Sequence, residues 1–159
     1  MIYVYTIYYT LYKYIIMNNQ QRKVTFTPLA PTPVGPYSQG VILSAGHSTL
    51  YLSGQIGINV RTGALVSPDS VVDQTQQAFT NFKTVVESAG ASLANVVKVN
   101  IFLTNMNNFP QVNEVMKQFF DAPFPARSTV GVASLPLGAL VELEGIVQLP
   151  NDEISSAKL

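Results

Sequence analysis

Residues 70–90, SVVDQTQQAFTNFKTVVESAG, decide the fold class of this chain. Their apolar positions recur three or four residues apart, which is the spacing of the buried face of an α-helix. Asp69 or Ser70 stands where a helix N-cap belongs, and Gly90 stands where a helix stops. The stretch therefore predicts one amphipathic helix. Its expected buried positions are Val71, Val72, Ala78, Phe79, Phe82, Val85, Val86 and Ala89.

Strand patterns lie on both sides of this helix. Residues 97–104 alternate between apolar and polar side chains, as a half-buried strand does. Residues 23–27 alternate in the same way, and the four prolines between 28 and 36 then predict an extended, ordered loop. Two short β-type runs, 41–43 and 49–52, flank Gly46, and this arrangement predicts a hairpin.

A second helix and two final strands complete the pattern. Asn107 or Asn108 is the expected cap, Pro110 lies in the first turn, and an apolar stripe follows that is typical of ordinary core. Residues 127–133 and 140–149 alternate as strands, and we expect them to form a hairpin through residues 135–138. The order of elements predicts an α+β domain with two helices on one face of a mixed sheet. The stripe consists of Val112, Val115, Met116 and Phe119.

Several charged residues fall on the expected outer face of this sheet. If Ser128, Val130 and Val132 face the helices, then Arg127, Thr129, Glu142 and Glu144 point the other way. This face is either solvated or part of an interface between subunits, and patterning alone leaves both open. In the expected hairpin, Arg127 and Glu142 lie on the order of 16 Å apart at ~3.3 Å per residue. Either the register differs, or the two meet only when a neighbouring subunit supplies its own copy.

Composition excludes several classes of function. Hydrophobic residues make up 47% of the 159 residues and charged residues only 11%, which favours a well-filled core and an oligomer. The formal net charge is zero, so nucleic acid is not an expected partner. The chain has no cysteine and one histidine, His47, which we expect in a solvated loop. No metal site is predicted.

The first sixteen residues differ from the rest. They hold six of the eight tyrosines, and their only charge is Lys13. The stretch is shorter than the roughly 20 residues that span a bilayer, and it lacks the arginines of a mitochondrial presequence. We expect residues 1–16 to be an extension outside the fold and residues 17–159 to form a single domain. The cytoplasm is the expected compartment, and import into mitochondria stays open.

Four segments, in this order, resemble the reactive-intermediate (imine) deaminases, which hydrolyse the enamine and imine products of amino-acid dehydratases. The segments are GPYSQG at 35–40, SGQI at 53–56, NNF at 107–109 with Val112-Asn113, and PARSTVGV at 125–132 running to VELEGI at 141–146. The resemblance extends over nearly all of residues 24–148. It departs from the family pattern at Thr129, where many relatives carry cysteine, and at Gly57, where proline is common.

The resemblance implies a chorismate-mutase-like α+β fold and a homotrimer with clefts between adjacent subunits. It implies that Arg127 binds the substrate carboxylate, a role that suits a planar guanidinium, and that Glu142 positions or activates water. Tyr37 matches a further residue of the catalytic cleft. Other structural roles also fit: Tyr37 in a turn, Ser53-Gly54 at a strand end and Asn113 on a solvated helix face. The expected substrate-binding residues besides Arg127 are Asn113, Ser53, Gly54 and Thr129.

The implied activity is hydrolysis of 2-iminobutanoate and 2-iminopropanoate to 2-keto acids and ammonia, without metal or cofactor. Two other functions remain open. One is a non-catalytic or regulatory protein that binds small carboxylates in the same cleft. The other is a ribonuclease or translation inhibitor, which the zero net charge and the single histidine disfavour.

Removal of residues 1–16 tests the domain boundary. We expect residues 17–159 to unfold at the same temperature and to have the same oligomeric mass as the full chain, because the core periodicities begin only near Val24. Thermal unfolding and light scattering on both proteins measure this. A clearly lower unfolding temperature for the shorter chain would contradict the boundary.

Overall fold

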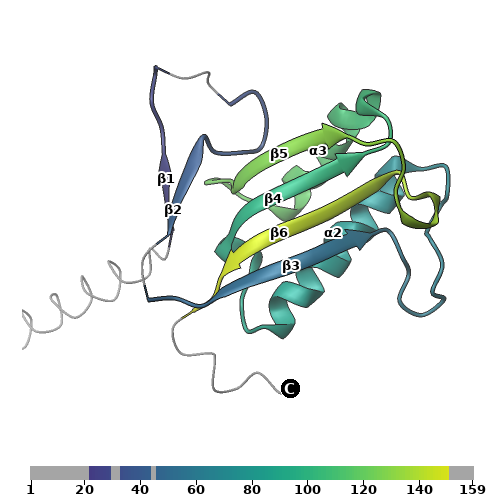
Figure 1. Cartoon of the computed structure of the whole chain (residues 1–159), viewed down its shortest axis with the longest axis horizontal. Coiled ribbons are helices and arrows are strands. Elements are labelled where there is room, and N and C mark those ends of the chain that lie inside the picture. Colours follow the sequence, from purple (N-terminus) through teal and green to yellow (C-terminus); the bar gives the residue numbers. More distant parts are fainter. Residues whose placement is uncertain (1–21, 30–32, 44–45, 151–159) are drawn as a thin grey trace, which may run out of the picture.

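A four-stranded mixed sheet covered by two helices forms the body of the protein. The computed structural model describes residues 22–29, 33–43 and 46–150. The sheet has the order β3-β6-β4-β5, and β4 runs parallel to β5 and antiparallel to β6. Both helices lie against one face of the sheet (Figure 1), so the predicted α+β class is confirmed. The strands are β3 (Thr49–Ile56), β4 (Val96–Leu103), β5 (Ala126–Gly131) and β6 (Val141–Gln148), and the helices are α2 (Val71–Ser88) and α3 (Phe109–Phe119).

A second, two-stranded sheet stands apart from the first (Figure 1). It pairs β1 (Arg22–Thr25) antiparallel with β2 (Gly40–Leu43). Three short 3₁₀ helices complete the described elements: Leu93–Asn95, Met106–Asn108 and Pro136–Gly138. The predicted extension, residues 1–16, lies outside the described residues.

The long helix α2 begins and ends where the sequence predicted. The Ser70 side chain accepts a hydrogen bond from the backbone N–H of Asp73 at 3.2 Å, which satisfies one of the free donors of the first turn. Gly90 follows the helix with φ of +75°, a left-handed conformation that glycine adopts without strain. Of the expected buried positions, Val72 is instead exposed.

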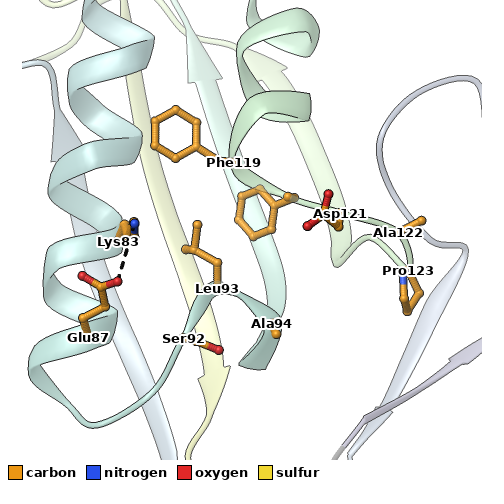
Figure 2. A pocket seen from close by; sticks show the side chains of 10 residues that line it. Lys83, Glu87, Ser92, Leu93, Ala94, Phe119, Asp121, Ala122 and Pro123 are labelled. Atoms are coloured by element: carbon orange, nitrogen blue, oxygen red, sulfur yellow. Dashed lines mark ion pairs between the residues drawn. The ribbon is translucent and has the colours of Figure 1, made fainter.

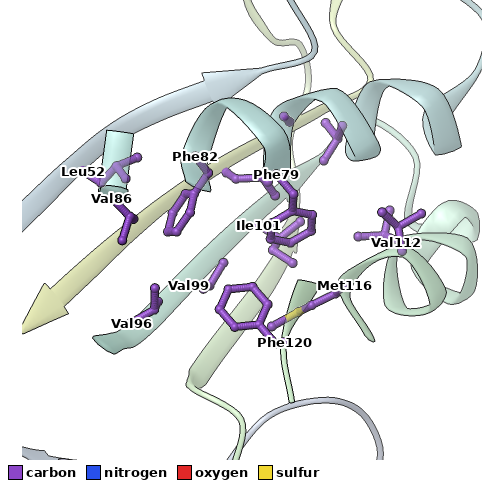
Figure 3. Close-up of a cluster of buried hydrophobic side chains, with 14 of the residues drawn as sticks. Leu52, Phe79, Phe82, Val86, Val96, Val99, Ile101, Val112, Met116 and Phe120 are labelled. Carbon is purple, nitrogen blue, oxygen red and sulfur yellow. The ribbon is translucent and has the colours of Figure 1, made fainter. Parts of the chain in front are cut away.

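The core lies between the two helices and the covered face of the sheet (Figure 3). Phe79 and Phe82 of α2 are fully buried, as is Ile101 of β4. The Phe79 ring stacks on Phe119 at 5.2 Å between centroids and meets Phe120 edge-on at 5.8 Å, so aromatic contacts join α2 to the end of α3. Because these large rings from α2 and from the end of α3 are buried against each other and against the sheet, they hold α3 in its position over the sheet.

Gln74 connects the start of α2 to the start of β6. It is fully buried, and its side-chain carbonyl accepts a hydrogen bond from the backbone N–H of Leu140 at 2.8 Å. Its amide donates to the carbonyls of Pro68 at 3.0 Å and Ser67 at 3.4 Å. A buried amide without hydrogen-bond partners would lower the stability of the fold. These bonds satisfy the Gln74 amide and thereby connect α2 to β6.

Neither predicted hairpin forms. Residues 41–43 pair with β1, and β3 pairs with β6 instead. The final two strands are also not neighbours, since β4 lies between β5 and β6. Consecutive strands usually pair, but the parallel β4–β5 connection through α3 places β5 at the outer edge and leaves the other side of β4 for β6.

The predicted facing of β5 is wrong as well. Arg127 pairs with Val99, whose side chain is buried against the helices, so Arg127 points to the covered face. Thr129 pairs with Ile101 and shares that face. Glu142 and Glu144 alternate with buried residues of β6 and do point to the open face, as predicted. β5 is an edge strand with a polar sequence, so apolar alternation gave no reliable sign of its covered side.

Gly145 offers a test of the packing between β6 and α2. A Cβ at this position would lie 2.6 Å from Phe82 Cζ and 3.0 Å from the Lys98 carbonyl oxygen. We expect Gly145→Ala to destabilise the protein by about 1–3 kcal/mol, the usual cost of overpacking a core. Urea unfolding measures the change, with Gln76→Ala on the exposed face of α2 as the control. Equal midpoints for Gly145→Ala and the wild type would contradict this account of the core.

Candidate active site

Arg127 lies at the centre of the best-defined polar cluster. Its side chain leaves β5 toward α3, where Nη1 donates a hydrogen bond to Asn113 Oδ1 at 2.6 Å. The same nitrogen also donates to the sulfur of Met116 at 3.6 Å. Asn113 and Met116 are three residues apart and therefore share one face of α3. The guanidinium is thus tied to a helix that the aromatic core already holds in place.

Two aromatic rings enclose the same guanidinium. Its central carbon lies 5.2 Å from the centroid of Tyr37 and 5.2 Å from that of Phe109. Both distances are within the range of cation–π attraction. Burial lowers the pKa of Arg127, and the interaction with Tyr37 raises it in part. The group nevertheless stays charged in any ordinary buffer, because guanidinium deprotonation lies far outside the physiological range.

No carboxylate neutralises this charge within the described part of the chain. The ion pairs found there join Lys83 to Glu87 and Lys117 to Glu114, and none includes Arg127. A half-buried cation whose neighbours are an amide, a thioether and two rings keeps its attraction for an external anion. A planar carboxylate matches the guanidinium with two parallel hydrogen bonds. The cluster can therefore bind a small carboxylate.

The loop that carries Tyr37 is attached to the chain beside Arg127. Ser38 forms a parallel bridge with Ala126, and its backbone N–H donates to the carbonyl of Pro125 at 3.0 Å. The Ser38 hydroxyl donates to the carbonyl of Phe124. Gly35 lies directly over the site, since a Cβ there would stand 3.2 Å from Arg127 Nη2. The glycine thus leaves room for the guanidinium.

Thr129 adds an unpaired hydroxyl on the same face of β5. It lies two residues beyond Arg127, and its Oγ1 is buried with no hydrogen-bond partner among residues 22–29, 33–43 and 46–150. A buried hydroxyl without a partner is unfavourable by itself. In the described residues this hydroxyl therefore keeps an unused hydrogen-bonding capacity on the face that Arg127 occupies.

Glu142, Ser53 and Gly54 form a separate group near the other edge of the sheet. A Cβ on Gly54 would lie 1.8 Å from Glu142 Oε1, so the carboxylate rests against the bare backbone of the glycine. The strand is irregular at this point, because the register between β3 and β6 shifts between Leu52 and Gln55. Any side chain at position 54 would displace the carboxylate.

The fold keeps these two groups apart. Arg127 is level with Val99 and Gly145, whereas Glu142 is level with Phe102. The Cα atoms of Arg127 and Glu142 are therefore about 14 Å apart, since they are offset by three residues along the strands and by two strand spacings across the sheet. The two side chains also point to opposite faces. One chain by itself therefore does not bring Arg127 and Glu142 to one small ligand.

Three surface hollows lie near these elements, and neither Arg127 nor Glu142 is among the residues that line them. One of about 340 Å³ is lined by Gly35 and Asn113, beside Arg127, and one of about 420 Å³ is lined by Gly54 and Ile56. A third, of about 410 Å³, lies between the ends of α2 and α3 and contains none of the predicted site residues (Figure 2). Its charged rim includes the exposed Lys83–Glu87 pair, whose Nζ and Oε1 are 3.6 Å apart. Of these three hollows, the first has the predicted site residue Asn113 in its lining and the second has Gly54.

Sequence reasoning missed Phe109, Met116 and Gly35. A usable signal existed, because Phe109, Asn113 and Met116 follow the spacing of one helical face. Met116 was assigned to the core; it is fully buried and also contacts Arg127. His47, expected in solvent, is half-buried, and its Nδ1 has no partner in the described segments.

The residues that the structure describes contain neither a cluster of metal ligands nor a helix that could cross a membrane. They hold no cluster of three metal-ligating side chains of the His, Cys, Asp and Glu types. None of their helices has the length and apolar character needed to cross a bilayer.

The fold and this site define a known class of proteins. A family model described as Endoribonuclease L-PSP matches residues 27–149, and the chain belongs to that family. Among its relatives, the 2-iminobutanoate/2-iminopropanoate deaminase of Dermatophagoides farinae is 59% identical over 126 residues, which are 79% of this chain and 95% of that protein. The human protein of the same name is 41% identical over 130 residues, 82% of this chain and 92% of that one.

Solved structures agree with the family assignment. Escherichia coli TdcF with bound serine is 38% identical, with a TM-score of 0.62, and the match covers 80% of this chain and 99% of that one. A Rid-family protein of Yersinia pestis, YyfB, is 30% identical with a TM-score of 0.74, over 81% of this chain and 99% of that one.

Proposed function

We propose that this protein is an imine deaminase that hydrolyses 2-iminobutanoate and 2-iminopropanoate to the 2-keto acids and ammonia. The observation that carries the proposal is the unneutralised guanidinium of Arg127, positioned for a small carboxylate. The names of the relatives supply the reaction, since proteins 59% and 41% identical to this chain are called deaminases of these imino acids.

The chemistry asks little of the protein. The C=N carbon of a 2-imino acid is already electrophilic, so orientation and delivery of water suffice. Arg127 holds the carboxylate, and Asn113, Tyr37 and Thr129 surround it. Glu142 accepts a proton from water as the oxygen bonds to C2 and the C=N electrons move to nitrogen. Glu142 returns this proton to nitrogen, which gives a carbinolamine. The hydroxyl proton of the carbinolamine then passes to nitrogen by way of Glu142 as the C–N bond breaks, and ammonia leaves with the 2-keto acid behind.

We further propose that the complete site forms between subunits of a homotrimer with a chorismate-mutase-like arrangement. The separation of Arg127 from Glu142 within one chain supports this, because a second copy can bring its own Glu142 to the first copy's Arg127. The face of the sheet away from the helices is uncovered (Figure 1), and exposed apolar side chains lie on it. Tyr51 is 76% exposed there and Val130 46%, beside Phe102 and Ile146. Three subunits are the number that the family resemblance implies.

The polar groups on that face suit an interface. Asn100 Nδ2 donates to Glu144 Oε1 at 2.8 Å, and Lys98 Nζ donates to Ser128 Oγ at 2.7 Å. Burial also lowers the pKa of Lys98. Because these partners lie on neighbouring strands of the same chain, the face can be covered without leaving them unpaired.

The oligomeric state tests the interface. We expect a mass of three chains by sedimentation at micromolar concentration, since the open face exposes large apolar side chains on both of its edge strands, Tyr51 on β3 and Val130 on β5. A charge placed on this face, as in Val130→Glu, should weaken assembly, whereas Thr84→Glu on the exposed side of α2 should leave it unchanged. A mass of one chain for the wild type would contradict the proposed trimer.

Arg127→Ala and Arg127→Lys test the site. Both should lower the turnover of 2-iminobutanoate about thirty- to thousandfold, the effect of losing roughly 2–4 kcal/mol of charge-assisted contact. The imino acid is generated from threonine by a dehydratase, and ammonia release is followed. Lysine restores little because its single ammonium does not reproduce the planar pair of donors.

Oligomeric mass is measured on the same samples. A variant that keeps its mass and loses turnover supports substrate binding, whereas loss of assembly first would indicate a structural role for Arg127. Wild-type protein that binds 2-ketobutyrate but does not accelerate imine hydrolysis would identify a carboxylate-binding protein in place of the enzyme.

A further inference from the structure

We infer that Phe109 is a positioning residue, whose ring keeps the Nε–Nη2 edge of Arg127 turned toward the ligand. The inference rests on the proposed function, because the ligand is taken to be the carboxylate of a 2-imino or 2-keto acid. Phe109 acts through Arg127 and does not itself touch the reacting atoms.

The hydrogen bonds of Arg127 define which edge remains for the ligand. Asn113 Oδ1 and Met116 Sδ both accept from Nη1, at 2.6 and 3.6 Å. A guanidinium has five N–H groups, and those on Nε and Nη2 form one of the two forks that fit a carboxylate. With Nη1 tied to α3, the fork of Nε and Nη2 is the one that a carboxylate meets side-on.

Gly35 keeps this edge accessible. A Cβ at that position would stand 3.2 Å from Nη2 and 3.7 Å from Asn113 Nδ2, so even a methyl group would crowd the nitrogen. Gly35 and Asn113, which both lie beside the guanidinium, also line a surface hollow of about 340 Å³. Because Gly35 has no side chain, the Nε and Nη2 donors of Arg127 are not blocked from that side.

The two rings restrain the plane of the guanidinium from different parts of the chain. Tyr37 belongs to the loop before β2, whereas Phe109 is the first residue of α3. Phe109, Asn113 and Met116 are spaced by four and three residues and form one face of this helix. The helix therefore supplies a ring and two acceptors as a single rigid unit, and Tyr37 presses against the group from the loop. Without the Phe109 ring, the guanidinium could tilt about its Nη1 bonds, and the fork would no longer face the ligand.

Three variants test this role. Phe109→Leu keeps an apolar side chain but removes the flat face, Phe109→Tyr restores the face, and Phe119→Leu removes another partly buried ring of α3 that stacks on Phe79 away from Arg127. We expect Phe109→Leu to raise the KM for 2-iminobutanoate and the Kd for 2-ketobutyrate about three- to thirtyfold, with kcat changed by less than about threefold. Phe109→Tyr and Phe119→Leu should stay within about threefold of the wild type in KM and Kd.

Turnover, calorimetric binding of 2-ketobutyrate and thermal unfolding are measured on each protein. Similar losses of stability in Phe109→Leu and Phe119→Leu, with weakened binding only in the first, support the inference. Unchanged binding in Phe109→Leu would overturn it, and so would equal weakening in Phe109→Tyr. In both of those results the wild type still turns over the imine. A wild type without turnover or binding would instead overturn the proposed function, and this inference with it.

Discussion

The site depends on holding a cation in a half-buried position without a counter-ion. Arg127 is kept there by an amide oxygen, a thioether sulfur and two aromatic rings. Each of these neighbours is neutral, so none cancels the charge. The helix α3 that supplies Asn113 and Met116 is joined to α2 at its far end by the Phe79–Phe119 and Phe79–Phe120 contacts. The core and the site are therefore parts of one packing arrangement.

The sequence predicted the elements of this fold better than their connections. Ser70 and Gly90 bound α2 as expected, because capping depends on local chemistry alone. The facing of β5 depends on which strand lies beside it, and nothing in residues 127–133 carries that information. Arg127, Tyr37 and Asn113 were named together through family resemblance, and the fold brings them together. Phe109 was quoted only as part of a motif, although it lies four residues before Asn113 and so shares one face of α3 with it.

The other part of the predicted site, around Glu142, depends on close contact between two strands. Glu142 lies against Gly54, where the missing side chain leaves space for a carboxylate. Sequence could point to both residues but not to their contact, because the register shift between Leu52 and Gln55 sets how the two strands meet. The open face of the sheet carries this group, whereas the covered face carries Arg127. In the proposed trimer, assembly of the subunits would bring these two separate groups into one reaction centre.

The neutral surroundings of Arg127 also determine how the protein responds to ionic strength. An ion pair loosens as dissolved salt screens its charges, whereas contacts with rings, an amide and a sulfur depend little on screening. The geometry of the guanidinium should therefore persist in concentrated salt. Its attraction for a dissolved carboxylate is, by contrast, a charge–charge interaction across partly hydrated space, and this weakens as ions accumulate. Orientation and capture of an anion are thus separable properties of one side chain, and only capture follows the salt content of the medium.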